Sequence, residues 1–159
     1  MIPDGLLIAL ARYIAAEAHA GSTRWDGQPY ITHPAAVAGA LDDPSAIAVA
    51  WLHDVVEDTW LTLGDLESFG IPRDVVEAVD AMTRRDGERY TDYIARVREN
   101  PIARRVKIAD IRHNLIDLPK DHGLNRRYLS ALRSLEATTD VSTPAPVATS
   151  RNKTGGSTS

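Results

Sequence analysis

The sequence predicts an all-α protein, a compact single-domain bundle of about seven or eight helices, from three observations. No segment shows the sustained alternation of apolar and polar residues that is typical of strands. Residues that begin helices, above all Asp or Asn followed by Pro, recur along the chain. The length of 159 residues fits one domain, and 43% hydrophobic residues is ordinary for a globular protein.

The first half of the chain is predicted to hold three helices. The first runs from Asp4 to His19 and is followed by the polar loop AGSTRWDGQPYI. A second is expected over Thr32–Leu41, with its threonine as N-cap. Asp43 and Pro44 then supply an N-cap and a first-turn proline. The helix that they begin, SAIAVAWLHDVVEDT, is apolar nearly all round before its histidine, so we expect it at the centre.

The second half is predicted to hold the remaining helices. Thr62–Asp65 is a variant of the capping box and begins a short helix. Pro72 begins another helix that ends near Thr83, and Thr91 begins the next. Asn100 and Pro101 cap a long helix to about Leu118, and the last helix is expected over Leu124–Leu135.

Composition separates a domain over residues 1–136 from a tail. Residues 137–159 contain almost no large apolar side chain, so we expect a disordered tail there. The net charge of -4 gives no overall basic field for nucleic acid or anionic membranes. The absence of cysteine excludes disulfides, thiolate zinc sites and a cysteine nucleophile.

The apolar start of the chain is not read as a signal peptide. Arg12 and Glu17 interrupt it, and no cationic segment precedes it. No run of about 18 uncharged apolar residues exists, so we expect no membrane association and a cytoplasmic location.

One stretch concentrates charge at the end of an apolar segment. Residues 51–60, WLHDVVEDTW, contain one histidine and three carboxylates. In a continuous helix His53 lies beside Glu57, and Asp54 beside Asp58. Carboxylates at a helix C-terminus repel the backbone dipole and each other, and a divalent cation resolves that repulsion. The alternative is a histidine satisfied in the core beside solvated acids.

A second stretch, VKIADIRHNLIDL, predicts an amphipathic helix with polar residues at the edge of its apolar face. Edge positions can direct polar groups into a cleft. Asp110 is therefore a candidate acid ligand, and Asn114, one turn further, can orient a water or a substrate oxygen. Lys107 either forms an ion pair with carboxylates of the cluster or contacts phosphate. An ordinary amphipathic helix is the alternative.

A third stretch, RWDGQPYITHP, places His33 at a helix start. Two histidines and two aspartates then form the candidate metal set: His33, His53, Asp54 and Asp110. Two neutral nitrogens with two carboxylates suit Mn²⁺, Fe²⁺ or Zn²⁺ better than Ca²⁺. Four protein ligands in an octahedral site leave positions for water and substrate, which suits hydrolysis at phosphorus.

We expect separate roles for the other ionisable residues. Glu57 and Asp58 are candidate catalytic residues that take a proton from water or protonate a leaving group. His19 is expected to cap or to pack against the loop, whereas His113 and His122 are expected at the surface.

The stretches AHAGSTRWDGQPYITHP, HDVVEDT and VKIADIRHNL, in that order, resemble the HD-domain superfamily of metal-dependent phosphohydrolases. More narrowly, they are similar to the (p)ppGpp hydrolase domain of RelA/SpoT-type enzymes and to small alarmone hydrolases. The resemblance implies an HD-type helical bundle, without a synthetase domain, that uses one Mn²⁺ per chain ahead of Fe²⁺ or Zn²⁺. It implies a guanosine-3′,5′-bis(diphosphate) 3′-pyrophosphohydrolase that cleaves pyrophosphate from the 3′ position of (p)ppGpp or related (p)ppApp.

The resemblance also assigns residues. The family's metal ligands fall on the four candidates above, and its catalytic acidic pair falls on Glu57 and Asp58. Its substrate-binding positions fall on Asn114, near the ribose and 3′-pyrophosphate, on Arg24, near the purine, and on Tyr30 of the same loop.

Departures from the family lie on the base and sugar side of the site. Trp25 stands where the long enzymes often have lysine, and Ile116 and Asp117 stand where they tend to have arginine and threonine. The resemblance therefore leaves open the preference between guanine and adenine alarmones.

Two further functional hypotheses remain at this point. The same metal site can serve an HD hydrolase acting on NADPH or on pyrophosphorylated tRNA ends. The chain can instead be a non-catalytic antitoxin that binds an alarmone-synthetase toxin, with the tail as interaction segment. The expected partners are a small nucleotide and, in the antitoxin hypothesis, that toxin; a tRNA end is the one nucleic acid considered.

Overall fold

The computed structural model describes residues 1–137, and the predicted tail lies outside them except for Ala137. This part of the chain is helical and has no strand, only one isolated bridge between Thr23 and Pro29, so the all-α prediction is confirmed. Its helices are α1 (Asp4–Ala18), α2 (Thr32–Gly39), α3 (Pro44–Leu52), α4 (Val55–Asp58), α5 (Leu63–Ser68), α6 (Arg73–Met82), α7 (Tyr90–Glu99), α8 (Pro101–Asp117) and α9 (Leu124–Glu136).

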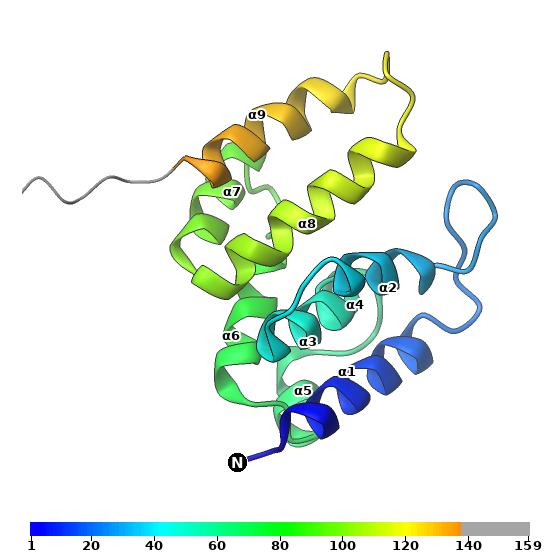
Figure 1. Ribbon diagram of the computed structural model, residues 1–159, viewed down its shortest axis with the longest axis vertical. Helices are drawn as coiled ribbons and strands as arrows, with labels where there is room; N and C mark the ends of the chain where they lie inside the picture. The colour runs from blue at the N-terminus through cyan, green and yellow to red at the C-terminus, as the bar shows by residue number, and fades with distance from the viewer. Residues whose placement is uncertain (138–159) are drawn as a thin grey trace, which may run out of the picture.

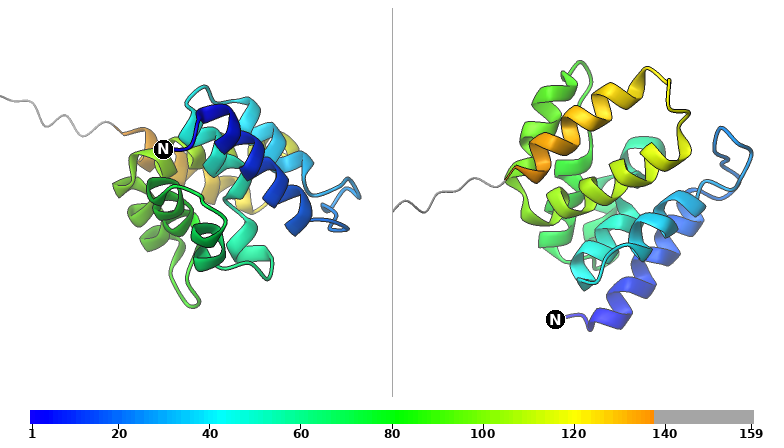
Figure 2. Two further views of the ribbon diagram at one scale, coloured as in Figure 1. Left: turned by 90° about the horizontal axis from the view of Figure 1, so that it is seen from below. Right: turned by 45° about the horizontal axis from the view of Figure 1, so that its top comes forward.

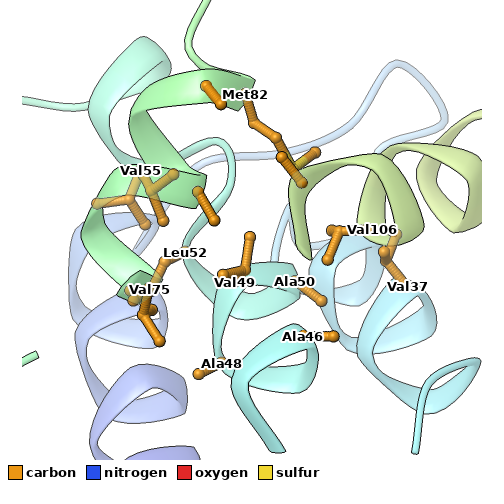
Figure 3. Packing of buried hydrophobic residues seen from close by; sticks show 14 of the residues in the cluster. Val37, Ala46, Ala48, Val49, Ala50, Leu52, Val55, Val75, Met82 and Val106 are labelled. Atoms are coloured by element: carbon orange, nitrogen blue, oxygen red, sulfur yellow. The ribbon is translucent and has the colours of Figure 1, made fainter. Parts of the chain in front are cut away.

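Helix α3 lies at the centre of the bundle, as its sequence predicts. It contacts α1, α2, α6 and α8. Figure 3 shows Val37 of α2, Val75 of α6 and Val106 of α8 around it. Its own buried side chains are mostly small, which lets the neighbouring helices approach closely. They are Ala46, Ala48, Val49, Ala50 and Leu52.

Side-chain caps fix where several helices begin. Asp43 accepts a hydrogen bond from the backbone N–H of Ala46 at 2.9 Å, just before α3. Asn100 accepts one from Ala103 at 2.9 Å, just before α8. Thr62 and Asp65 form a reciprocal capping box at α5. These predicted caps are confirmed, and each satisfies backbone donors that a helix start leaves free.

The predicted N-cap of α2 is wrong. Ile31 occupies the cap position, where no side chain accepts a hydrogen bond. Thr32 is already helical, and its hydroxyl donates to the carbonyl of Pro29 at 2.8 Å. The threonine therefore stabilises the end of the preceding loop.

The long helix predicted from Pro44 is interrupted at His53 and Asp54, which separates α3 from α4. The Nδ1 atom of His53 lies 2.7 Å from the carbonyl oxygen of Ala50. In a continuous helix that carbonyl would accept the backbone N–H of Asp54. The imidazole thus competes with the backbone for one acceptor, which explains the turn at this point.

Two connections project from the same side of the molecule, as Figures 1 and 2 show. One is the loop of residues 19–31 between α1 and α2, and the other joins α8 to α9. Helix α8 lies between α2 and α9 and contacts both. It is therefore the one helix between the loop that leads into α2 and the connection that leads into α9. None of the described helices has the length and apolar character needed to cross a membrane.

Arg96 of α7 joins the end of α6 to the loop that follows it. Its guanidinium donates to the backbone carbonyls of Ala81 at 3.0 Å and Thr83 at 2.9 Å. It also pairs with the carboxylate of Glu88 at 2.9 Å, and this hydrogen bond lowers the pKa of Glu88 to about 2. That contribution to stability is present above the ordinary glutamate pKa and is lost as pH falls toward about 2.

We predict that Arg96→Met lowers the free energy of unfolding by about 2 kcal/mol at neutral pH, because carbonyls and a carboxylate lose charge-assisted hydrogen bonds. Urea unfolding followed by circular dichroism measures the change. Arg73→Met is the matched control, because Arg73 is 88% exposed and pairs with Glu77 at the surface. We expect less than about 0.5 kcal/mol for the control. Equal effects of the two substitutions would contradict the role of Arg96.

Candidate metal centre

Three of the predicted metal ligands are buried in the core. His33 lies on α2, His53 follows α3 and Asp110 lies on α8. With His19 they make up the buried polar residues of the described chain. Asp54, at the turn between α3 and α4, is partly buried beside them. Polar groups cost free energy in a core unless they are paired or bind a ligand, so this cluster needs a physical explanation.

The four residues converge, although 77 positions separate the first from the last. The Nε2 atom of His33 lies 2.9 Å from Oδ1 of Asp110. The Nε2 atom of His53 lies 3.1 Å from Oδ2 of Asp54 and 3.7 Å from Oδ1 of Asp110. Ligand atoms of His33, His53 and Asp54 all lie within 4.8 Å of one another, a spacing that could hold a metal ion. Coordination by these residues, and by Asp110, stays a prediction.

The hydrogen bonding of His53 directs one nitrogen into this cluster. Because Nδ1 faces the carbonyl of Ala50, it carries the hydrogen in the neutral ring, and Nε2 has a lone pair. Within the described residues, Nε2 is buried and has no hydrogen-bond partner. A buried lone pair that faces carboxylate oxygens suits a cation. The residues present therefore fit a divalent metal.

The charges of the cluster do not balance while both histidines are neutral. Asp54 and Asp110 carry two negative charges, and Lys107, whose Nζ is 2.7 Å from Oδ2 of Asp110, carries one positive charge. Burial lowers the pKa of His53, but Asp54 and Asp110 outweigh burial and raise the pKa well above its ordinary value. A proton on the imidazole thus supplies the missing charge, and a bound metal would replace that proton.

The candidate catalytic acids flank the cluster on α4. Asp58 lies 3.4 Å from the hydroxyl of Tyr30, which also donates to Asp54. Glu57 accepts the backbone N–H of Arg84 at 3.2 Å. Burial and the charge of Asp54 raise the pKa of both Glu57 and Asp58. Raised carboxyl pKa values are common for groups that exchange protons in catalysis.

A cleft of about 450 Å³ opens at the cluster. This volume is within the range typical of small-molecule sites. All four predicted substrate-binding residues line it: Arg24, Tyr30, Lys107 and Asn114. Glu57 instead lines a neighbouring hollow with Arg84 and Glu88. The cleft lining therefore includes the predicted substrate residues and three of the four candidate metal ligands, whereas His53 and both candidate catalytic acids, Glu57 and Asp58, lie outside the lining.

Two lining residues are engaged with other side chains. The amide of Asn114 donates to Oδ1 of Asp110 at 3.1 Å, which holds that carboxylate toward the histidines. The guanidinium of Arg24 pairs with Asp117 at 2.5 Å and ties the α1–α2 loop to α8. Both residues thus fix the shape of the cleft.

The prediction that His113 is a surface residue is wrong. Its Nδ1 atom lies 2.9 Å from Nδ1 of His33, and its Nε2 atom lies 3.7 Å from Asp117. If His33 presents the lone pair of Nε2 to the cluster, its Nδ1–H donates to His113. Helical spacing carried the signal, since Asp110, His113 and Asp117 share one face of α8.

The remaining histidines agree with their predictions. His19 follows α1 and packs against Tyr30, with ring centroids 4.7 Å apart. His122 is exposed.

The fold and the site define an all-α domain with a histidine and carboxylate cluster buried beside its central helix. No family model matches the chain. The bifunctional (p)ppGpp synthase/hydrolase SpoT of Escherichia coli is 40% identical over 131 residues, which cover 77% of this chain and 18% of that protein. The guanosine-3′,5′-bis(diphosphate) 3′-pyrophosphohydrolase of Vibrio cholerae is 41% identical over 128 residues, 76% of this chain and 17% of that protein.

Structural comparison agrees on the fold. A structure of a metazoan orthologue of SpoT that hydrolyses ppGpp matches with a TM-score of 0.65 at 24% identity. The match covers 85% of this chain and 87% of that chain. The predicted resemblance to RelA/SpoT-type hydrolase domains is confirmed by these similarities. The chain spans less than a fifth of the length of the two bacterial relatives.

We predict that His113→Ala weakens Mn²⁺ binding about tenfold, because His33 loses the partner that orients its ring. The measurement is the Mn²⁺ concentration at which chelator-treated protein is half-saturated, determined from bound Mn²⁺ in equilibrium dialysis. His122→Ala is the control, since His122 is exposed, and we expect it to keep the wild-type midpoint. An unchanged midpoint in His113→Ala would show that His33 does not depend on His113.

Proposed function

We propose that the chain is a metal-dependent hydrolase that removes pyrophosphate from the 3′ position of (p)ppGpp or of related (p)ppApp. The names of its bacterial relatives include this reaction, and one of them also names the synthase reaction. The choice of hydrolysis rests on one observation about this chain. His33, His53 and Asp54 form a buried group able to hold a metal, beside a cleft of nucleotide size.

Mn²⁺ is the metal that we propose. Imidazole nitrogens from His33 and His53 and carboxylates from Asp54 and Asp110 make a mixed donor set that suits Mn²⁺, Fe²⁺ or Zn²⁺, and the resemblance to RelA/SpoT-type hydrolase domains favours Mn²⁺ among them. A metal there would supply Lewis-acid polarisation of a phosphate oxygen and an activated water.

The proton chemistry is assigned to the carboxylates of α4. Glu57 and Asp58 have raised pKa values, so each is suited to accept a proton from water or to hand one to the departing group. The hydroxyl of Tyr30 lies near both Asp54 and Asp58 and links the acid side of the site to the candidate ligands.

The phosphate side of the cleft is assigned to Lys107 and Asn114. The ammonium group of Lys107 is held by Asp110 and lines the cleft, so the predicted ion pair and a phosphate contact are compatible. Asn114 has one amide hydrogen engaged with Asp110, and its second N–H can donate to a substrate oxygen.

The other hypotheses differ from this proposal in the substrate or in the need for catalysis. Hydrolysis of NADPH or of pyrophosphorylated tRNA uses the same chemistry, so a substrate panel decides among these reactions. Action as an antitoxin toward an alarmone synthetase and a cytoplasmic location stay predictions.

We expect chelator-treated protein to release pyrophosphate from ppGpp or ppApp only after Mn²⁺ is restored. Parallel reactions contain NADPH and pyrophosphorylated tRNA, and metal content is measured on the same preparation. Loss of a bound ion explains inactivity without Mn²⁺. Absence of turnover with every 3′-pyrophosphorylated nucleotide would overturn the proposed function.

Substitutions separate metal binding from proton transfer. We predict that Asp54→Asn loses both bound Mn²⁺ and turnover, whereas Glu57→Gln keeps Mn²⁺ and loses about 10²- to 10⁴-fold in kcat. Glu67→Gln, an exposed carboxylate on α5, is the matched control and should keep both. Equal kcat values for Glu57→Gln and Glu67→Gln would remove Glu57 from the mechanism.

A further inference from the structure

Trp25 is a large apolar side chain left in solvent at the mouth of the candidate site. Its residue is 72% exposed, yet it lines the same cleft as Asp54 and Asp110. An indole ring has a large apolar face, and at the mouth of a cleft that face is available to pack against a ring of a ligand. The position of Trp25 therefore points to a flat apolar group of the ligand.

The backbone holds this tryptophan in a defined place. Trp25 is the second residue of a turn in which the N–H of Gly27 donates to the carbonyl of Arg24 at 2.9 Å. The N–H of Arg24 in turn donates to Gln28 at 2.8 Å. Gly27 has a φ of 83°, which glycine adopts without strain. Since Arg24 is also paired with Asp117 of α8, the loop is anchored at both its backbone and its side chain.

The cleft has two chemically different ends. The candidate metal ligands and Lys107 form a charged end. At the other end lies Trp25 with Leu118, the neighbour of the Asp117 that pairs with Arg24, and Leu124 and Tyr128 are further apolar residues of the lining. A phosphorylated group suits the first end, and an aromatic ring suits the second.

Arg24 is poorly placed to provide the ring contact itself. Its side chain is 11% exposed and its guanidinium is paired with Asp117. Trp25, the next residue, presents much more surface to the cleft mouth. The indole of Trp25 is therefore a better stacking surface than the guanidinium of Arg24.

We propose that Trp25 stacks on the base of the nucleotide and is the main source of affinity for the base in this chain. This inference rests on the proposed function, because it assigns the base end of the same cleft. Stacking uses the face of the ring and tolerates different bases. It accounts for base binding at a position where the resembling enzymes often have lysine.

The test compares the kinetics of Trp25→Ala and Trp25→Phe with those of the wild type. We expect Trp25→Ala to raise KM for ppGpp about tenfold with kcat within about twofold, since each stacked base contributes measurably to affinity. Trp25→Phe should restore most of the affinity, because it keeps an aromatic face. Trp60→Ala, a tryptophan that is 77% exposed and does not line the cleft, should keep the wild-type KM.

Inorganic pyrophosphate distinguishes stacking from a structural role of the loop. It has no base, so its inhibition constant should be the same in wild type and Trp25→Ala. A KM within about twofold of wild type in Trp25→Ala, or a parallel rise in the inhibition constant for pyrophosphate, would overturn the inference.

A binding measurement separates failure of this inference from failure of the proposed function. GDP added to the wild-type protein should quench its tryptophan fluorescence, and the quenching should be lost in Trp25→Phe. If the wild type shows this quenching but hydrolyses no substrate in the panel, the proposed reaction is wrong and the stacking role stands. If GDP quenches both proteins equally, Trp25 does not contact the base.

Discussion

The structure depends on the burial of two carboxylates beside its central helix. Asp110, which is buried, and Asp54, which is partly buried, approach two imidazoles beside Ala50 and Leu52 of α3, which are fully buried. Removing ions from water costs several kcal/mol each unless opposite charges replace the water. Lys107 balances one carboxylate, and the second requires a proton on histidine or a metal ion. The residues whose charges are unbalanced in the metal-free fold are therefore the candidate ligands, so a metal bound there would couple stability to function through one site.

One hydrogen bond, between His53 and the backbone of Ala50, determines how the charged residues are arranged at this turn. In a continuous helix His53 and Asp54 would point about 100° apart. The bond from the imidazole of His53 to the carbonyl of Ala50 coincides with the end of α3, and beyond the turn His53 and Asp54 approach to 3.1 Å. It also determines which imidazole nitrogen carries hydrogen, so the interruption of the helix and the orientation of the lone pair have the same origin.

The sequence predicts most of the fold because its signals are local. Prolines after Asp43 and Asn100, together with the caps themselves, locate α3 and α8, and the apolar circumference of α3 predicts its central position. The convergence of the histidines and aspartates was also predictable from residue type. The interruption at His53 was not, because HDVVED is compatible with an uninterrupted helix and the competing acceptor is revealed only by the ring orientation. Helical spacing places His113 on one face of α8 with Asp110 and Asp117, but its partner His33 lies 80 residues away, so the local pattern gives the face and not the contact.

Helix α8 sets the distance between the two ends of the cleft. Asp110 faces the histidine cluster, and Asp117 holds the loop that carries Trp25. Seven residues of helix separate these anchors by about 10 Å, so the distance from the charged end to the aromatic end is set by a rigid element. A ligand with phosphate alone would leave the indole in water, and an apolar ligand would leave the carboxylates without a cation. A nucleotide bound through a metal ion would satisfy both ends at this separation, because its base and its phosphates are themselves held apart by a ribose.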